Sequence, residues 1–272
     1  MKTMKTISLK KLQTLKTEGK RFATITAYDA SFAKLVANAQ IECLLVGDSL
    51  GNVIQGNGTT VPVSMDDMCY HTACVHEGLK FSEFKPLVIA DLPFMSYSST
   101  ELALENATAL MQSGAQMVKV EGGQWLEETV SVLTERGINV CAHLGLTPQS
   151  VDALGGFKVQ GRDEAAAAQL IQDARALQSA GAGMLVLECI PTELGKRVSN
   201  DLHIPVIGIG AGPYTDSQVL VLYDMLGMNT GHVPRFVKNY MENASDITSA
   251  LINYREEVIN GYFPAPEHCY DN

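Results

Sequence analysis

Aromatic residues and charges are both scarce in this sequence of 272 residues. A single tryptophan is present, aromatic residues make up 7% of the chain, and charged residues make up 18%. Hydrophobic residues reach 46%, and this balance of hydrophobic and charged residues excludes general disorder. With so few aromatic rings, the core of the folded protein must consist mainly of aliphatic side chains.

Positive charge and long apolar runs are also lacking. The chain has 20 lysines and arginines against 30 aspartates and glutamates, a formal net charge of −10. We therefore expect no nucleic-acid partner, because an acidic surface repels the phosphate backbone. No run approaches the roughly 18 apolar residues of a membrane span. The basic segment 1–20 lacks the apolar core of a signal peptide, so we expect a cytoplasmic protein with no membrane partner.

The cysteines form no pattern typical of a disulfide framework. The chain has six of them, and Cys43, Cys141 and Cys189 lie inside apolar runs. An even number of cysteines in a chain of this length does not imply bridges. We expect buried thiols, as in a protein of a reducing compartment.

Short apolar runs alternate with longer amphipathic segments along the chain, a pattern typical of a parallel sheet. We predict eight strand–helix units in a single domain over 1–272, that is, a (β/α)8 TIM barrel of the α/β class. An N-terminal extension (1–20) precedes the barrel and a C-terminal helix (246–261) closes it. A doubly wound open sheet is the alternative. The predicted strands are 22–27, 43–47, 87–90, 117–120, 138–142, 184–187, 206–209 and 219–222, the last of which also fits a helix.

Two predicted connections are longer than simple turns and rich in glycine. They cover 51–62, after the second strand, and 144–161, after the fifth. Long glycine-bearing loops at one end of a barrel are candidates for lids or ligand walls. Ordered surface loops or subunit contacts are the alternative.

Polar residues repeatedly follow the predicted strands at their carboxyl ends. In an α/β barrel these positions line one mouth, where active sites lie. Asp48, Asp91 and Glu121 follow consecutive strands, and neighbouring strands lie about 4.8 Å apart, so the three carboxylates can converge. Oxygen ligands of this kind suit Mg²⁺. The alternative is a hydrogen-bonded carboxylate group with Lys119 as counter-ion, since Lys119 shares a strand face with Glu121.

Nine segments of the sequence together resemble the ketopantoate hydroxymethyltransferase family. They run in order from about Arg21 to about His268, with residues 82–85 as a small insertion. The segments are TITAYD, LLVGDSLG, ADLPFMSY, MVKVEGG, HLGLTPQS, VQGR, LVLECIP, IPVIGIGAG and GHVPRF. We interpret His232, in the last segment, as a structural residue.

The resemblance implies both an activity and a set of site residues. The family transfers a hydroxymethyl group from 5,10-methylenetetrahydrofolate to 3-methyl-2-oxobutanoate, with a bound Mg²⁺, and usually forms a homodecamer. Carried over by motif, Glu188 resembles the proton acceptor. The metal-site residues by resemblance are Asp48, Asp91 and Glu121; the keto-acid contacts are Asp48, Ser49, Asp91 and Lys119; and His143 and Tyr28 resemble further pocket residues.

Two other functions remain open on the sequence. One is a metal-dependent carbon–carbon lyase acting on oxoacids, from the wider superfamily of phosphoenolpyruvate-binding barrels, which uses the same carboxylate and metal chemistry. The other is a keto-acid sensor without catalysis, which would need no base at the position of Glu188. A folate-independent cleavage assay distinguishes the first of these from a hydroxymethyltransferase.

Overall fold

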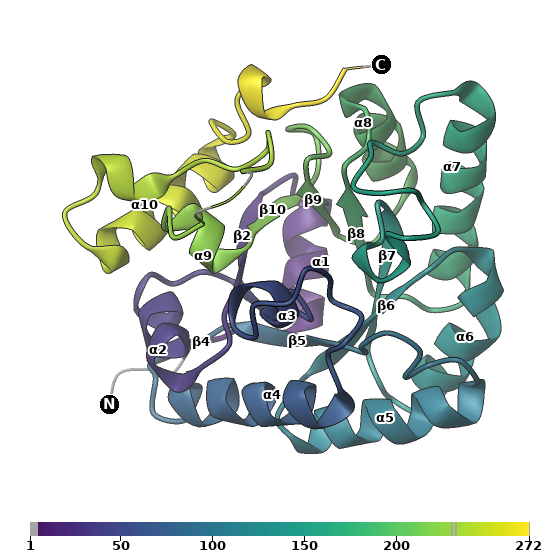
Figure 1. Cartoon of the computed structure of the whole chain (residues 1–272), viewed down its shortest axis with the longest axis horizontal. Helices are drawn as coiled ribbons and strands as arrows, with labels where there is room; N and C mark the ends of the chain where they lie inside the picture. The colour runs from purple at the N-terminus through teal and green to yellow at the C-terminus, as the bar shows by residue number, and fades with distance from the viewer. Residues whose placement is uncertain (1–4, 230, 232, 272) are drawn as a thin grey trace.

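Eight parallel strands form a closed barrel at the centre of the molecule (Figure 1). The computed structural model describes residues 5–229, 231 and 233–271. The barrel closes where Ser217 pairs with Phe22, which confirms the predicted barrel and excludes the open sheet. In their order around the barrel the strands are β10 (Ser217–Leu220), β2 (Phe22–Thr26), β3 (Cys43–Val46), β5 (Leu87–Asp91), β6 (Met117–Glu121), β7 (Val140–Gly145), β8 (Met184–Glu188) and β9 (Val206–Ile209).

Helices surround the barrel, and several begin at an aspartate or serine cap. Asp29 accepts hydrogen bonds from the backbone N–H groups of Ser31 and Phe32, so this aspartate caps a helix. Asp163 caps α7 in the same way. The helices are α1 (Leu9–Thr17), α2 (Ala30–Asn38), α3 (Leu50–Val53), α4 (Met65–Leu79), α5 (Thr100–Gln112), α6 (Glu127–Glu135), α7 (Glu164–Ser179), α8 (Thr192–Asp201), α9 (Leu222–Met225) and α10 (Ile247–Asn260).

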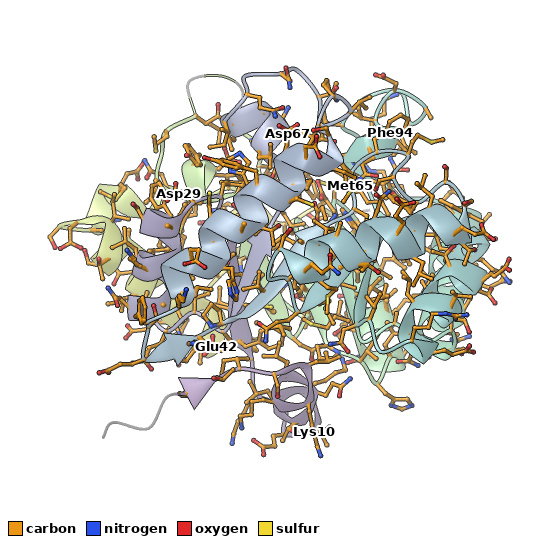
Figure 2. The ribbon with its side chains drawn as sticks, turned by 90° about the horizontal axis from the view of Figure 1, so that it is seen from below. Lys10, Asp29, Glu42, Met65, Asp67 and Phe94 are labelled. Carbon is orange, nitrogen blue, oxygen red and sulfur yellow. The ribbon has the colours of Figure 1, made fainter. Side chains whose placement is uncertain are left out.

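The N-terminal extension covers the amino end of the barrel. Figure 2 shows α1, labelled at Lys10, on the opposite side of the molecule from Phe94, which follows β5. Leu12 of α1 is fully buried, and the Lys16 ammonium lies 2.6 Å from Asp216 Oδ2. A strand pair not expected from the sequence, β1 (Lys5–Thr6) with β4 (Phe84–Lys85), holds the extension. The predicted insertion at 82–85 thus supplies the partner strand.

The predicted strands are confirmed, with shifts at their ends. The run expected at 138–142 starts at Val140 and extends to Gly145, and the run expected at 219–222 is a strand over Ser217–Leu220. The helix that the sequence allowed in this region begins only at Leu222, as α9. The N–H of Leu222 donates a hydrogen bond to Thr26 Oγ1. Asp91, Glu121 and Glu188 are the last residues of their strands, one residue beyond the predicted ends, so the rigid sheet itself holds these carboxylates.

The strands are buried on both faces, as expected for a parallel barrel. In β6, Val118 and Val120 are fully buried among hydrophobic residues, and they alternate with Lys119 and Glu121. All six cysteines are free, and the three expected to be buried are buried. None of the helices in the described ranges is long and apolar enough to cross a bilayer. His232 lies outside the described residues.

Candidate active site

Ionisable side chains gather at the carboxyl end of the barrel, where the sequence predicted them. Asp48 lies just after β3, and the others stand on four consecutive strands, β5 to β8. All but one are almost completely buried, with 4% exposure or less, and Glu188 is the exception, with a side chain that is 14% exposed. The group comprises Asp48, Asp91, Lys119, Glu121, His143 and Glu188. Glu188 is therefore the member of the group that is open to solvent.

Lys119 lies between two of the carboxylates. Its Nζ atom is 3.1 Å from Asp91 Oδ2 and 3.2 Å from Glu121 Oε1. Asp91 Oδ2 also accepts the backbone N–H of Asp48 at 3.0 Å. Lys119 is thus the counter-ion of these carboxylates, which is the arrangement that the sequence allowed as the alternative to a metal site. In the part of the chain that the structure describes, no group of three or more histidine, cysteine, aspartate or glutamate side chains is already arranged around a metal position.

The residues nevertheless fit a divalent cation. Asp91 Oδ1 is buried and has no hydrogen-bond partner among the described groups, and a buried oxygen of this kind normally has one. Burial raises the pKa of Asp48 well above its usual value, and the Asp91 and Glu121 charges raise it further. Burial also raises the pKa of Asp91, although Lys119 partly offsets this. A cation at Asp48 and Asp91 would relieve this excess of buried negative charge.

The charge on Lys119 is fixed by the same neighbours. Burial by itself would lower the pKa of Lys119, but the Asp91, Glu121 and Asp48 carboxylates raise it well above its usual value. For Glu121, burial would raise the pKa, but Lys119 and His143 lower it to about 2. The site therefore keeps a permanent positive charge beside an ionised carboxylate.

His143 connects the buried cluster to Glu188. Its Nδ1 atom lies 3.0 Å from Glu121 Oε1, and its Nε2 atom lies 3.3 Å from Glu188 Oε2. Burial would lower the pKa of His143, but Glu121 raises it to about 9, so the imidazole is protonated at neutral pH. His143 Nε2 has no hydrogen-bond partner within the described residues, so its contact with the Glu188 carboxylate is an ion pair.

We expect the protein to lose stability as the pH rises from about 6.5 toward about 9. Over this window native His143, with a pKa of about 9, keeps a proton that the unfolded chain releases. The stabilisation is complete below about pH 6.5 and its loss should be on the order of 3 kcal/mol. Urea unfolding across the window measures it. A His143→Gln variant should lose this dependence, and a slope equal to that of the wild type would contradict the assignment.

Tyr28 and Ser49 form a second, neutral part of the site. The Tyr28 hydroxyl lies 2.9 Å from Ser49 Oγ, and burial raises the pKa of this tyrosine far above its usual range. Tyr28 is therefore a neutral side chain that orients the Ser49 hydroxyl. Ser49 is the residue before the short helix α3, and its side chain makes no cap hydrogen bond. Its hydroxyl, which contacts Tyr28, can therefore make a further hydrogen bond to a ligand.

Gln149 is a site residue that the sequence did not single out. Its side-chain amide donates to Asp48 Oδ2 at 2.8 Å and to the Leu92 carbonyl at 2.9 Å, and its backbone N–H donates to Glu121 Oε2 at 3.0 Å. Tyr97 donates to the amide oxygen at 2.5 Å. The sequence signals were the long loop after the fifth strand and the segment HLGLTPQS, which contains Gln149, but no spacing rule indicates which residue of a loop turns inward.

The loop that carries Gln149 is fixed at both of its ends to the strand of Glu188. The Leu146 N–H donates to the Glu188 carbonyl at 2.8 Å, and the Gln160 N–H donates to the Cys189 carbonyl at 2.9 Å. The segment 144–161 is therefore an anchored loop, and its role as a ligand wall stays a prediction. The other long segment, 51–62, folds on itself, with Asn52 donating to the Asn57 carbonyl.

Replacing Gln149 by leucine should destabilise the protein by about 1–3 kcal/mol, because Asp48, Tyr97 and the Leu92 carbonyl each lose a buried partner. Urea unfolding measures the loss. Gln172→Leu is the matched control, since that amide is exposed on α7 and makes one 3.4 Å contact with Gln124. Equal losses of stability in the two variants would show that the buried hydrogen bonds of Gln149 do not stabilise the protein more than an exposed glutamine does.

Comparisons with known proteins agree with one another. A family model described as ketopantoate hydroxymethyltransferase matches residues 6–266. A 3-methyl-2-oxobutanoate hydroxymethyltransferase from Shewanella loihica is 57% identical over 267 residues, which cover 98% of this chain and 100% of that one. The enzyme of the same name from Cronobacter sakazakii is 54% identical with the same coverage.

Solved structures of distant proteins share the barrel. A phosphonopyruvate hydrolase in complex with oxalate and Mg²⁺ superposes with a TM-score of 0.60 at 13% identity, covering 79% of this chain and 80% of that one. A 2,3-dimethylmalate lyase of the phosphoenolpyruvate mutase and isocitrate lyase superfamily has a TM-score of 0.58 at 18% identity, covering 81% and 82%. At these identities the similarity concerns the fold.

Proposed function

Because the chain belongs to the ketopantoate hydroxymethyltransferase family, we propose that it converts 3-methyl-2-oxobutanoate and 5,10-methylenetetrahydrofolate into ketopantoate and tetrahydrofolate. This is a step of pantothenate and coenzyme A biosynthesis, which we place in the cytoplasm. The observation that supports the chemistry best is the position of Glu188, a partly exposed carboxylate that His143 holds beside a buried, charged cluster.

The first chemical step is the removal of a proton from C3 of the keto acid. We propose that Glu188 takes this proton, since its carboxylate is the one that reaches the solvent side of the cluster. The electron pair of the broken C–H bond then extends over the neighbouring ketone, and the Lys119 ammonium stabilises the negative charge that develops on oxygen. His143 keeps Glu188 in place and counters its charge until the proton arrives.

The second step forms the new carbon–carbon bond. C3 attacks the methylene carbon of the folate, and the bond from that carbon to one folate nitrogen breaks as the carbon–carbon bond forms. Water then adds its oxygen to the same carbon while the bond to the second folate nitrogen breaks. The nitrogens of the released tetrahydrofolate take up the proton that Glu188 removed and a proton from water. The carboxylate of the keto acid needs hydrogen-bond donors that are separate from Glu188, the base that removes the C3 proton. We assign this binding to the Ser49 hydroxyl, oriented by Tyr28, and to the Lys119 ammonium. Asp48 and Asp91 would contact the keto acid through the bound cation.

We propose that Asp48 and Asp91 hold Mg²⁺ directly. Glu121, the third metal-site residue expected from the sequence, would contribute its negative charge close to the cation. Asp91 Oδ1 has no other partner in the described structure, whereas both Glu121 oxygens already accept hydrogen bonds from Lys119, His143 and Gln149. When bound, the cation would act as a Lewis acid toward the oxygens of the keto acid.

Removing divalent metal should abolish product formation. We expect ketopantoate, detected by mass spectrometry, from the purified protein with Mg²⁺ and both substrates, and none with excess chelator. Asp91→Asn should weaken Mg²⁺ binding, measured by calorimetry, because it takes away half of the proposed ligand pair. Full turnover with chelator would refute the role of the metal, and cleavage of oxoacids without folate would favour the lyase instead.

We propose a homodecamer as the assembly, in line with the family resemblance. Several large apolar side chains lie on the surface of the isolated chain, where water is an unfavourable environment for them. Phe81 is 91% exposed, Tyr262 is 72% exposed and Tyr70 is 67% exposed. Analytical ultracentrifugation distinguishes a decamer from a monomer.

A further inference from the structure

An open cavity lies beside the candidate active site. It has a volume of about 270 Å³ and is bounded by α7 and by the residues at the ends of β6 and β7. The backbone of four glycines, Gly122, Gly123, Gly145 and Gly161, forms much of its wall. A Cβ atom at any of the four would overlap a neighbouring residue of the protein, so glycine allows the close packing of the segments that border the cavity. None of these glycines takes part in the chemical steps proposed above.

The cavity begins within one strand spacing of the proposed base. Gly122 directly follows Glu121, and its N–H donates to the His143 carbonyl at 3.2 Å. Gly145 is paired in the sheet with Glu188, and adjacent strands lie about 4.8 Å apart. Gly145 has a φ of +93°, and a Cβ atom there would overlap the Glu188 carbonyl oxygen. Glycine at this position therefore permits the close approach of the backbones at Gly145 and Glu188, which border the cavity.

One carboxylate defines the polar edge of the cavity. Asp173 of α7 lines it, and its Oδ1 atom accepts the Gln124 N–H at 3.1 Å and the Gln169 amide at 3.0 Å. No hydrogen bond to Oδ2 is present within the described ranges. Leu144 and Leu170 provide apolar surface, and the amides of Gln160 and Gln169 provide further polar groups.

We propose that this cavity binds the pterin ring of the folate co-substrate, with Asp173 accepting the N–H donors of its pyrimidinone edge. The inference rests on the proposed function. A pterin is flat, has apolar faces that suit glycine and leucine walls, and carries an amino group and a ring N–H side by side. Asp173 Oδ1 already accepts two hydrogen bonds, so the two lone pairs of Oδ2 are the acceptors for these donors. A drug-sized ligand needs about 300–1,000 Å³, so the cavity holds the ring system and not the whole folate.

The remainder of the folate then extends over the loop outside the cavity. Lys158 and Arg162 flank the lining residues Gln160 and Gly161, and both are exposed. Neither has an ion-pair partner among the described residues. In a chain with a net charge of −10, two unpaired cations at this edge suit the glutamate carboxylates of a folate tail. The neighbouring Phe157 is 67% exposed and offers a ring face to the aminobenzoyl group.

Two substitutions in the cavity test the proposal by steady-state kinetics. Asp173→Asn removes the charge that accepts the pterin donors, and we expect the KM for 5,10-methylenetetrahydrofolate to rise about 10- to 100-fold. Ala166→Phe places a ring in the cavity from the first turn of α7 and should raise the same KM. In both variants the KM for the keto acid should change much less. Asp152→Asn, an exposed aspartate of the neighbouring loop, is the matched control and should leave both KM values unchanged.

The outcome separates this proposal from the proposed function itself. An unchanged folate KM in both cavity variants overturns the pterin site while the enzyme remains active. If the wild-type protein makes no folate-dependent product, the proposed function fails and no KM can be compared. Tetrahydrofolate binding is then titrated by calorimetry under nitrogen. Weaker binding by Asp173→Asn than by the wild type supports the cavity, and equal binding, or no binding by the wild type, overturns it.

Discussion

Replacing Glu188 by glutamine should slow the exchange of the C3 proton of 3-methyl-2-oxobutanoate by on the order of 10²- to 10⁴-fold. Glutamine has the same shape and retains an oxygen toward His143 Nε2, which lies 3.3 Å from Glu188 Oε2 in the native protein. It cannot, however, take up a proton at neutral pH. Proton NMR in deuterated water follows the exchange directly and without folate.

Binding of the keto acid is the control for the Glu188 variant. Because the carboxylate and ketone of the substrate are assigned to Ser49 and the Lys119 cluster, calorimetry should find an affinity close to that of the wild type. Glu193→Gln is the matched substitution. It changes an exposed glutamate of α8, 4.0 Å from Lys196, and should not affect the exchange of the C3 proton. Unchanged exchange in Glu188→Gln would exclude Glu188 as the base.

Replacing Lys119 by methionine should cost about 3–5 kcal/mol of the free energy of unfolding, the usual effect of removing one partner of a buried ion pair. Methionine fills a similar volume, but Asp91 and Glu121 lose the ammonium that lies 3.1 and 3.2 Å from them. Urea unfolding at neutral pH measures the loss. Activity should also disappear, because the charge that stabilises the reacting oxygen is gone.

Magnesium should restore part of the stability of this variant. If the carboxylates of Asp48 and Asp91 form a cation site, Mg²⁺ replaces the missing positive charge and raises the melting temperature of Lys119→Met. Lys16→Met is the matched control, because Lys16 lies at the other end of the barrel and, among the described residues, forms an ion pair with Asp216 alone. Equal effects of Mg²⁺ on both variants would contradict a specific site.

Local patterns explain why so much of the barrel was predictable. A strand alternates its side chains with a period of two, so the spacing of Lys119 and Glu121 was enough to place both on one face. Apolar runs of four to six residues between longer amphipathic segments indicated parallel strands, and parallel strands bring their carboxyl ends to one mouth. The convergence of Asp48, Asp91 and Glu121 followed from these two rules.

The same patterns do not distinguish a site residue from a helix cap. Asp29 and Asp48 both follow a strand, yet Asp29 caps α2 through Ser31 and Phe32, whereas Asp48 is buried against Gln149. The difference depends on the direction that the chain takes after the strand. That direction is set by packing against neighbouring helices, which a single sequence segment does not contain.

The amino-acid sequence by itself determined the eight strands, their order along the chain, and the set of charged residues at their ends. The tertiary structure decided how these charges are paired. Closure of the barrel put Lys119 between Asp91 and Glu121, and brought His143 between Glu121 and Glu188. The path of the loop 144–161 inserted Gln149 and opened the cavity at Asp173. Strand periodicity is a property of neighbouring residues, but these contacts join residues far apart in sequence, and only the packing of the whole chain fixes their distances.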